Sequence, residues 1–520
     1  MVLMKYGMGH KKKGVVDIDS ENKVGWGRTL NMGSPLRRYM LAAVLALQII
    51  ILVIVRGLPV PFPWLPPCPV PVADVSATVG AAALNVTASW DDDSETSNDS
   101  KDDVAVSGDF VTESVASDVS NAENASCELG LVYVYNLPPV FNTDLLKNCS
   151  TLSPWNSFCP AIVNFGYGDV IRRPKLQAEE RGTWYKTDQF TGEIIFHKKL
   201  MEHPCVTDKP HLARAFYVPF YAGLAVGRYL WREYPAEVRD RDGKMVLEWL
   251  QEQEYWKRNS GWDHFMVVGR ITWDFRRSKD EDWGSSFMYM PGIKNVTRLL
   301  IERNPWDDKE MGVPYPTAFH PRSAQDVLRW QDHLRNVERT KLFSFAGASR
   351  KYIPNDFRGI LLDQCMRSMN CRSLDCSGTR CVNDTMAAVH LFLDSTFCLQ
   401  PRGDSFTRKS IFDCLIAGSI PVFFWHRSAY WQYEWHLPSN YSSYSVFISK
   451  HDIRNGTQIE EVLKRIPAAE VQRLRETVIS SIPRYVYSAP GHRLKGMKDA
   501  VDTAIDGFLN TVKSSSLAHI

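Results

Sequence analysis

Apolar and polar positions follow two different periods along the chain from about residue 131 onward. Short apolar runs predict strands that are buried on both faces of a sheet. These runs lie at 131–135, 215–219, 265–268, 341–345, 396–399 and 419–424. Between some of them, apolar residues recur every three or four positions, which predicts helices near 355–368, 384–393 and 404–417. Strands that alternate with helices predict an α/β fold with parallel sheets.

The second half of this pattern begins as a new strand near residue 341, so we place a domain boundary between residues 335 and 336. The expected domains are an N-terminal domain over 127–335 and a C-terminal domain over 336–520. Near the end of the chain, apolar residues from Leu494 to Val512 form one stripe at helical spacing. This stripe predicts a closing helix that packs on another part of the fold.

The first 126 residues have a different pattern and predict three segments. Residues 1–38 are rich in Lys and Arg, residues 39–55 form an apolar run, and residues 56–126 are Pro-rich and then acidic. The run is long enough to cross a thin bilayer, and the basic residues before it predict a cytoplasmic N-terminus. A cleaved signal peptide is the alternative, but Pro-rich sequence stands where its cleavage site would be. We expect a cytoplasmic tail, a transmembrane signal anchor and a disordered stem.

Sequons and cysteines support a lumenal position for everything after the predicted anchor. All sequons follow it, at Asn85, Asn98, Asn124, Asn148, Asn295, Asn383, Asn440 and Asn455. Ten of the 11 Cys lie from Cys127 onward, where an oxidising lumen allows disulfides. Four of them, Cys365, Cys371, Cys376 and Cys381, lack the paired spacing of a structural zinc site, so disulfides are expected there. The chain is predicted to be a glycosylated single-pass type II membrane protein.

Composition excludes little. The 520 residues are 44% hydrophobic and 23% charged, as in ordinary globular proteins. A net charge of +2 gives no reason to expect a nucleic-acid partner. The aromatic share is 12%, with 16 Trp. Such rings either fill a core or stack on the C–H faces of sugars.

The segment from Cys398 to Phe424 carries the strongest chemical signal. It predicts a basic loop with Arg402, Arg408 and Lys409, then a helix capped by Asp404 or Ser405 and ended by Gly418, then a buried strand. Cations beside free N–H groups form an anion site that suits a diphosphate. Asp413 lies inside the helix, within reach of a ribose. The alternative is an ordinary solvated helix cap.

The residue order of this segment resembles the donor-binding segment of the exostosin-like glycosyltransferases, family 47, in the plant branch of xyloglucan galactosyltransferases. The resemblance extends over roughly residues 127 to 510. Its further motifs lie at 131–139, 187–190, 196–197, 203–205, 216–221, 263–265, 269–277, 343–347 and 435–438.

The resemblance implies an inverting transfer of β-galactose from UDP-galactose to xylose side chains of xyloglucan at the Golgi membrane. It implies the GT-B architecture, two Rossmann-like domains that face a cleft, and allows a complex with other hemicellulose glycosyltransferases. Arg402 matches the loop arginine of the family's donor site, and Asp413 matches its acidic helix position. The expected donor-binding residues are Gly347, Arg402, Asp404, Ser405, Arg408, Lys409 and Asp413.

An inverting enzyme needs one general base, which we expect on the N-terminal domain. The candidates are Asp274, His264, Glu193 and Asp188. Asp274 is preferred because it closely follows a predicted strand. The alternatives are that Asp274 pairs with Arg276 or Arg277, and that His264 is a core histidine.

No metal cofactor is expected. Metal-dependent transferases hold their ion with a D-x-D motif at a strand end, and two such motifs follow the anchor, Asp240-Arg241-Asp242 and Asp280-Glu281-Asp282. Neither follows an apolar strand, and both are interpreted as solvated charge in loop-like sequence. Cations of the basic loop would then neutralise the diphosphate.

Two other functions stay open. Ser419 stands where one common plant form has Cys, and Trp425-His426-Arg427 follows the strand, as in the subgroup that modifies the middle xylose. A related subgroup transfers galacturonic acid, and His426 or Arg427 could bind its carboxylate. A catalytically silent Golgi scaffold is the third possibility, although the intact Arg402 and Asp413 speak against it.

Overall fold

The computed structural model describes residues 127–518 apart from 154–156, 173–181, 351–355, 379–380 and 382–383. The predicted tail, anchor and stem, residues 1–126, lie outside the described residues, as do Cys68 and the sequons at Asn85, Asn98, Asn124 and Asn383. Within the described part, helices that could span a membrane are not found.

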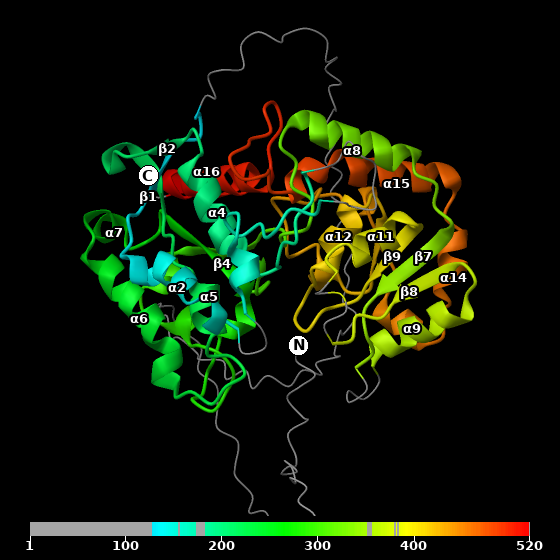
Figure 1. Ribbon diagram of the computed structural model, residues 1–520, viewed down its shortest axis with the longest axis horizontal. Helices are drawn as coiled ribbons and strands as arrows, with labels where there is room; N and C mark the ends of the chain where they lie inside the picture. Colours follow the sequence, from blue (N-terminus) through cyan, green and yellow to red (C-terminus); the bar gives the residue numbers. More distant parts are fainter. Residues whose placement is uncertain are drawn as a thin grey trace, which may run out of the picture. The chain divides into compact units, whose positions relative to one another are not determined.

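The first half of the described chain forms a six-stranded sheet in which all neighbouring strands are parallel (Figure 1). The strand order is β2-β1-β3-β4-β5-β6. The strands are β1 (Leu131–Val134), β2 (Val206–Thr207), β3 (Ala213–Tyr217), β4 (His264–Ile271), β5 (Thr297–Glu302) and β6 (Glu310–Gly312). The prediction of a parallel sheet is therefore confirmed.

The second half forms a five-stranded parallel sheet of order β11-β10-β9-β7-β8. Its strands are β7 (Lys341–Ala346), β8 (Cys371–Leu374), β9 (Ser395–Gln400), β10 (Ile420–Phe423) and β11 (Val446–Phe447). Both sheets grow in the same way, since the second strand lies on one side of the first and later strands lie on the other. The strand order thus reverses between β1 and β3 and again between β7 and β9. Open parallel sheets bind ligands at the carboxyl ends of the strands beside such a reversal.

Helices cover the two sheets. Those of the first half are α2 (Thr143–Lys147), α3 (Cys159–Ile162), α4 (Gly192–Met201), α5 (Ala222–Gly227), α6 (Ala236–Glu252) and α7 (Glu254–Asn259). Those of the second half are α8 (Ala324–Asn336), α9 (Phe357–Arg367), α11 (Ala387–Leu393), α12 (Ser410–Ile416), α13 (Lys450–Arg454), α14 (Ile459–Lys464), α15 (Ala468–Ser480) and α16 (Ala500–Ala518).

The apolar runs become strands because both faces of each sheet are buried. Along β4, Phe265 and Val267 belong to one hydrophobic cluster, whereas Met266 and Val268 belong to another. Successive side chains of a strand point to opposite faces, so the two clusters lie on the two sides of the sheet. A continuous apolar run without polar alternation is the expected sequence of such a strand.

The closing helix α16 packs on the first sheet, although it follows the second sheet in the chain (Figure 1). The ring of Phe508 lies 4.6 Å from that of Phe265. The helix begins at Ala500 and not at Leu494 as predicted. Asp499 ends the preceding turn and accepts hydrogen bonds from the N–H groups of Val501 and Asp502, which caps the helix there.

Ten cysteines form five disulfides, at Cys127–Cys205, Cys149–Cys159, Cys365–Cys371, Cys376–Cys381 and Cys398–Cys414. The four closely spaced cysteines therefore pair with each other, which confirms that they form disulfides.

The interpretation of Asp240 as solvated charge is wrong. Asp240 lies in helix α6 and is buried. It forms an ion pair with Arg277 and accepts hydrogen bonds from Ser285 and Ser286. These hydrogen bonds and Arg277 hold its pKa below the usual value against the effect of burial. Asp280 is 81% exposed and pairs with the same guanidinium.

We predict that Asp240→Ala lowers the free energy of unfolding by roughly 3–5 kcal/mol, because it leaves Arg277 buried without its inner partner. Thermal or chemical unfolding of the purified chain measures this. Asp280→Ala is the matched control, since it removes an exposed partner of the same arginine and should change stability by less than about 1 kcal/mol. Equal effects of the two substitutions would contradict the assignment.

Candidate functional site

The loops after β7 and β9 meet at the point where the strand order of the second sheet reverses. Arg408 donates a hydrogen bond of 2.5 Å to the carbonyl of Ala346, the last residue of β7. In return, Arg350 from the loop after β7 donates to the carbonyl of Gly403 and forms an ion pair with Asp404. The two loops therefore hold each other through arginine side chains.

This junction concentrates positive charge. Arg350, Arg358 and Arg408 lie close enough to influence each other, and burial together with the other two arginines lowers the pKa of Arg358 to about 9. Burial likewise lowers the pKa of Arg408 to about 10, and Asp404 opposes the shift. One terminal nitrogen of Arg408 is buried and has no hydrogen-bond partner among the described residues. An anion with several oxygens would pair this nitrogen and relieve the repulsion.

Arg402 and Gly347 complete the junction. The guanidinium of Arg402 lies over the ring of Trp425, and its backbone carbonyl accepts a hydrogen bond from Arg358. A Cβ atom at Gly347 would lie 2.7 Å from the ring of Phe345 and 3.3 Å from Arg408. A side chain at position 347 would therefore push the ring of Phe345 aside and press against Arg408, which explains why a glycine follows β7.

The helix expected from residue 404 begins only at Ser410, so Asp404 and Ser405 do not cap it. Asp404 instead pairs with Arg350, and Ser405 is buried in the loop. The Arg350–Asp404 ion pair holds residues 403–409 as a loop, although the apolar pattern alone would start the helix at residue 404. The prediction that Asp404 or Ser405 caps this helix is therefore wrong. Asp404 nevertheless lies in the same cluster as the cations.

Asp413 and Lys409 form an ion pair of 2.6 Å across one turn at the start of α12. Burial raises the pKa of Asp413, against the opposite effects of Lys409 and Arg408. The structure thus brings Arg408, Lys409 and Asp413 together at the start of α12, whereas the side chain of Arg402 lies against Trp425.

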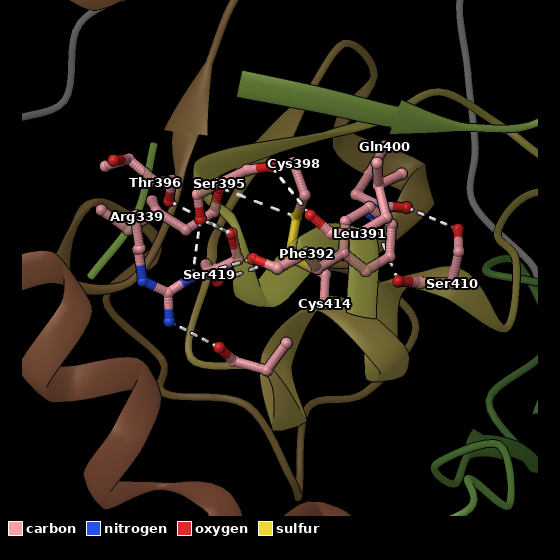
Figure 2. Close-up of a disulfide and its surroundings, with 12 residues drawn as sticks. Arg339, Leu391, Phe392, Ser395, Thr396, Cys398, Gln400, Ser410, Cys414 and Ser419 are labelled. Carbon is pink, nitrogen blue, oxygen red and sulfur yellow. Dashed lines mark hydrogen bonds between the residues drawn. A yellow bond between two sulfur atoms is a disulfide. The ribbon is translucent and has the colours of Figure 1, made fainter. Parts of the chain in front are cut away.

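The disulfide Cys398–Cys414 connects β9, which ends just before this loop, to α12, which follows it (Figure 2). Gln400 and Ser410 add a second connection, with a hydrogen bond of 2.8 Å from the serine hydroxyl to the amide oxygen. Farther along, Ser419 donates to the carbonyl of Ser395 at the start of β9. Because strand and helix are joined at two points, and the residue before β10 is bound to the start of the same strand, both ends of the loop 401–409 are fixed.

The sequence-predicted base candidates of the first half already have partners within the protein. Asp274 lies just after β4 and accepts hydrogen bonds from Trp283 at 2.8 Å and Arg270 at 3.4 Å. The expected alternative, a pair with Arg276 or Arg277, is wrong, since these arginines bind other carboxylates. Burial raises the pKa of Asp274.

Glu193 and His264 are more deeply engaged. Glu193 accepts three backbone hydrogen bonds, from Gly223, Leu224 and Gly269 at 2.6–3.2 Å, and burial raises its pKa to about 7. His264 begins β4, at the opposite end of the strand from Asp274. It is buried and bonded to Asp263 and Tyr135. The structure therefore does not bring His264 to the site, and the interpretation as a core histidine is the right one.

Asp188 differs from these three because it is only half-buried. One of its oxygens accepts the N–H of Phe190 at 2.9 Å, and the other has no hydrogen-bond partner in the described part of the chain. Burial raises its pKa, whereas Arg270 from the first half and Lys409 from the second lower it. Asp188 thus lies within electrostatic reach of the cationic loop.

Sequence reasoning missed Glu302, the last residue of β5. Its two oxygens accept hydrogen bonds from the hydroxyl of Tyr315 at 2.5 Å and from the N–H of Thr407 at 3.2 Å. Burial raises its pKa to about 7, although both hydrogen bonds oppose the shift. Glu302 joins the first sheet to the loop 401–409. The sequence does hold a signal for Glu302, because this acidic residue directly follows the apolar run Leu299-Leu300-Ile301. That run is not among the predicted strands.

The arginine and lysine side chains make this site suited to a bound diphosphate. Among the described residues, no cluster of His, Cys, Asp or Glu has an arrangement that could hold a metal ion.

Comparison with known proteins adds independent information. The family model of the exostosin GT47 domain matches residues 126–463, which include every site residue described above. The xyloglucan galactosyltransferase XLT2 of Arabidopsis thaliana is 54% identical over 396 residues, 74% of this chain and 76% of the relative. The xyloglucan galactosyltransferase MUR3 of the same plant is 44% identical over 385 residues, 73% of this chain and 62% of the relative. Its xyloglucan-specific galacturonosyltransferase 1 is 41% identical over 390 residues, 74% of this chain and 58% of the relative.

The raised pKa of Glu302 predicts a specific dependence of stability on pH. An unfolded Glu ionises near pH 4.5, whereas the folded protein keeps this proton up to about pH 7. The stabilising contribution is complete below pH 4.5 and falls as the pH rises to 7, by up to about 3 kcal/mol. Glu302→Gln removes this titration, so wild type should lose stability relative to the variant between pH 5 and pH 8.

Unfolding midpoints of both proteins at several pH values measure the difference. Glu434→Gln is the control, since Glu434 is 52% exposed and pairs with Arg303 at 3.1 Å. Its midpoints should follow those of wild type across the whole range. Parallel curves for wild type and Glu302→Gln would contradict the prediction.

Proposed function

The chain belongs to the exostosin GT47 family, and we propose that it transfers β-galactose from UDP-galactose to xylose side chains of xyloglucan, with inversion at the sugar carbon. The observation that carries this proposal is the 54% identity to a xyloglucan galactosyltransferase over 74% of the chain. The cationic junction between the loops after β7 and β9 supports the use of a nucleotide sugar. Intact cations and Asp413 favour an active enzyme over a silent scaffold.

For the donor, we propose that Arg350, Arg358, Arg402, Arg408 and Lys409 neutralise the diphosphate of UDP-galactose. Two parallel sheets with the same growth pattern support the GT-B architecture, with the donor at the reversal point of the second sheet. The buried terminal nitrogen of Arg408 supplies a hydrogen-bond donor for phosphate. Charge-assisted hydrogen bonds stabilise the negative charge that develops on the leaving diphosphate.

We propose that this transfer needs no metal cofactor. The side chain of Asp240, which a D-x-D motif would need as a ligand, is occupied by Arg277 and two serines. The guanidinium and ammonium groups near α12 can take the place of a divalent cation as the electrostatic partner of the diphosphate.

For the compartment, we propose the Golgi membrane and a type II topology with this domain in the lumen. Five disulfides support an oxidising compartment. The sequon residues Asn148, Asn440 and Asn455 are exposed, as a glycosylated residue must be.

For the general base, we propose Asp188 in place of Asp274. A base must reach the acceptor hydroxyl, and both oxygens of Asp274 accept hydrogen bonds within the protein. Asp188 keeps accessible surface and one oxygen without a protein partner among the described residues. The nearby Lys409 connects it electrostatically to the donor loop. After proton transfer, the deprotonated acceptor oxygen attacks the sugar carbon and the diphosphate leaves toward the arginines.

The function is tested by a donor screen with the full-length membrane protein and xylosylated glucan oligosaccharides. We expect transfer from UDP-galactose, release of UDP, and a β-linked product. Activity should persist in excess EDTA. Preferred transfer from UDP-galacturonic acid would favour the function of the galacturonosyltransferase relative, and activity that EDTA abolishes and Mn²⁺ restores would contradict metal-free transfer.

We predict that Asp188→Asn lowers kcat by roughly 10²–10⁴-fold and leaves UDP affinity unchanged, because it keeps shape but removes the basic oxygen. Asp274→Asn should lower the free energy of unfolding, since it weakens buried hydrogen bonds, and should change kcat far less than Asp188→Asn does. Arg402→Ala serves as the donor-site comparison and should weaken UDP binding by about ten- to a hundredfold. Steady-state kinetics and UDP titration separate these effects. Normal turnover by Asp188→Asn with an inactive but folded Asp274→Asn would return the base to Asp274.

A further inference from the structure

Three tryptophan rings surround the guanidinium of Arg427 at the carboxyl ends of β5 and β10. Its central carbon lies 4.8 Å from the ring centre of Trp306, 5.2 Å from that of Trp431 and 5.4 Å from that of Trp425. Trp306 follows β5 of the first sheet, whereas the other two rings follow β10 of the second. One cation therefore joins aromatic residues from both halves of the protein.

This group is continuous with the donor loop. Phe406, in the middle of loop 401–409, contacts Trp306 at 5.7 Å between ring centres and stacks on Trp425 at 5.6 Å. On its other side it stacks on Trp273, the neighbour of Asp274. The aromatic rings thus extend outward from the place where the donor and the first-sheet carboxylates meet.

Packing alone does not explain the arrangement. Tryptophans that fill the core of this protein, such as Trp184 and Trp330, are fully buried. Trp306 is 61% exposed and Trp431 is 40% exposed. The side chain of Arg427 forms no ion pair or hydrogen bond with the described residues, and its Nε atom is buried and unpaired. Cation–π contact holds the rings in position, while the terminal nitrogens of the half-buried Arg427 have no hydrogen-bond partner in the described part of the chain.

We propose that Trp306, Arg427 and Trp431 form a binding platform for the neutral glucan backbone of the acceptor. Indole rings match the C–H faces of pyranose sugars, and guanidinium N–H groups donate to their hydroxyls. Both rings contact the same guanidinium, so they are close enough for neighbouring sugars of one chain to reach both. A neutral ligand fits because the cation is already stabilised by aromatic faces. This inference rests on the proposed function and names the subsite that holds its acceptor.

The test compares acceptor and donor binding in the full-length membrane protein. Trp306→Ala and Trp431→Ala should each raise the KM for xyloglucan polymer by about three- to tenfold. Both should keep kcat at saturating acceptor and should keep UDP affinity. Arg427→Ala should have at least the same effect, because it removes the contact that orders both rings. Arg427→Lys keeps the charge but loses the planar group, so its KM should lie between those of wild type and Arg427→Ala.

Trp262→Ala is the matched control. Trp262 is 47% exposed and also carries a cation over its ring, since Lys309 lies 3.7 Å from the ring centre. It precedes β4 and lies at the opposite end of that strand from Trp273, so its loss should leave every kinetic constant unchanged. Thermal unfolding of each variant verifies that it is folded.

The possible outcomes separate the platform from the function. An unchanged KM in folded Trp306→Ala, Trp431→Ala and Arg427→Ala would overturn the platform. Loss of UDP affinity with a normal KM would also overturn it, and would indicate a site for the nucleobase. A switch of donor preference between neutral and uronic sugars in Arg427→Ala would overturn it in favour of a carboxylate site. Titration of wild type and Trp306→Ala with xyloglucan polymer in the absence of donor measures the platform alone. Polymer binding that depends on Trp306, without galactose transfer by wild type, would refute the function and retain the platform.

Discussion

Mutual repulsion among closely packed, half-buried cations is the constraint on which the rest of the site depends. Arg350, Arg358 and Arg408 would separate if they were free, because Arg350 and Arg408 both lower the pKa of Arg358 and Arg350 also lowers that of Arg408. Backbone carbonyls of Ala346, Arg402 and Gly403 hold them in place, with Asp404 as the nearest counter-charge. Those carbonyls are available because β7 and β9 end side by side at the reversal of strand order. The fold thus stabilises a concentration of charge that a bound diphosphate would relieve.

Carboxylates around this cluster have unequal freedom. Glu193, Asp274 and Glu302 are buried, and their oxygens accept hydrogen bonds from backbone or side chains. Their raised pKa values therefore reflect desolvation within fixed networks and not readiness to accept a substrate proton. Asp188 combines a raised pKa with accessible surface, which is why we propose it as the base. Glu302 is best understood as the residue that sets the position of loop 401–409 against the first sheet.

The sequence predicts most strands because a strand buried on both faces has a simple signature, as along β4 and β10. It also predicts the cationic loop, whose residues are contiguous. It fails where partners are distant in sequence. From sequence, Asp240 is interpreted as solvated because its partner Arg277 is 37 residues away in the chain. Helix α12 begins later than predicted because Asp404 forms an ion pair with Arg350. The strand β5 is missed because Arg298 interrupts its apolar run, although that arginine is itself buried. Residues 39–55 and the stem lie outside the described residues, so those expectations stay predictions.

The position of α16 determines the order in which the protein can mature. One face of the first sheet, around Val132 and Phe265, is covered by Val501, Ile505 and Phe508. During synthesis this face stays exposed until the final residues of the chain emerge, long after the first sheet's own strands are complete. Because every strand of the second sheet precedes α16 in the chain, a truncation near residue 500 would keep both sheets but leave this face of the first sheet uncovered.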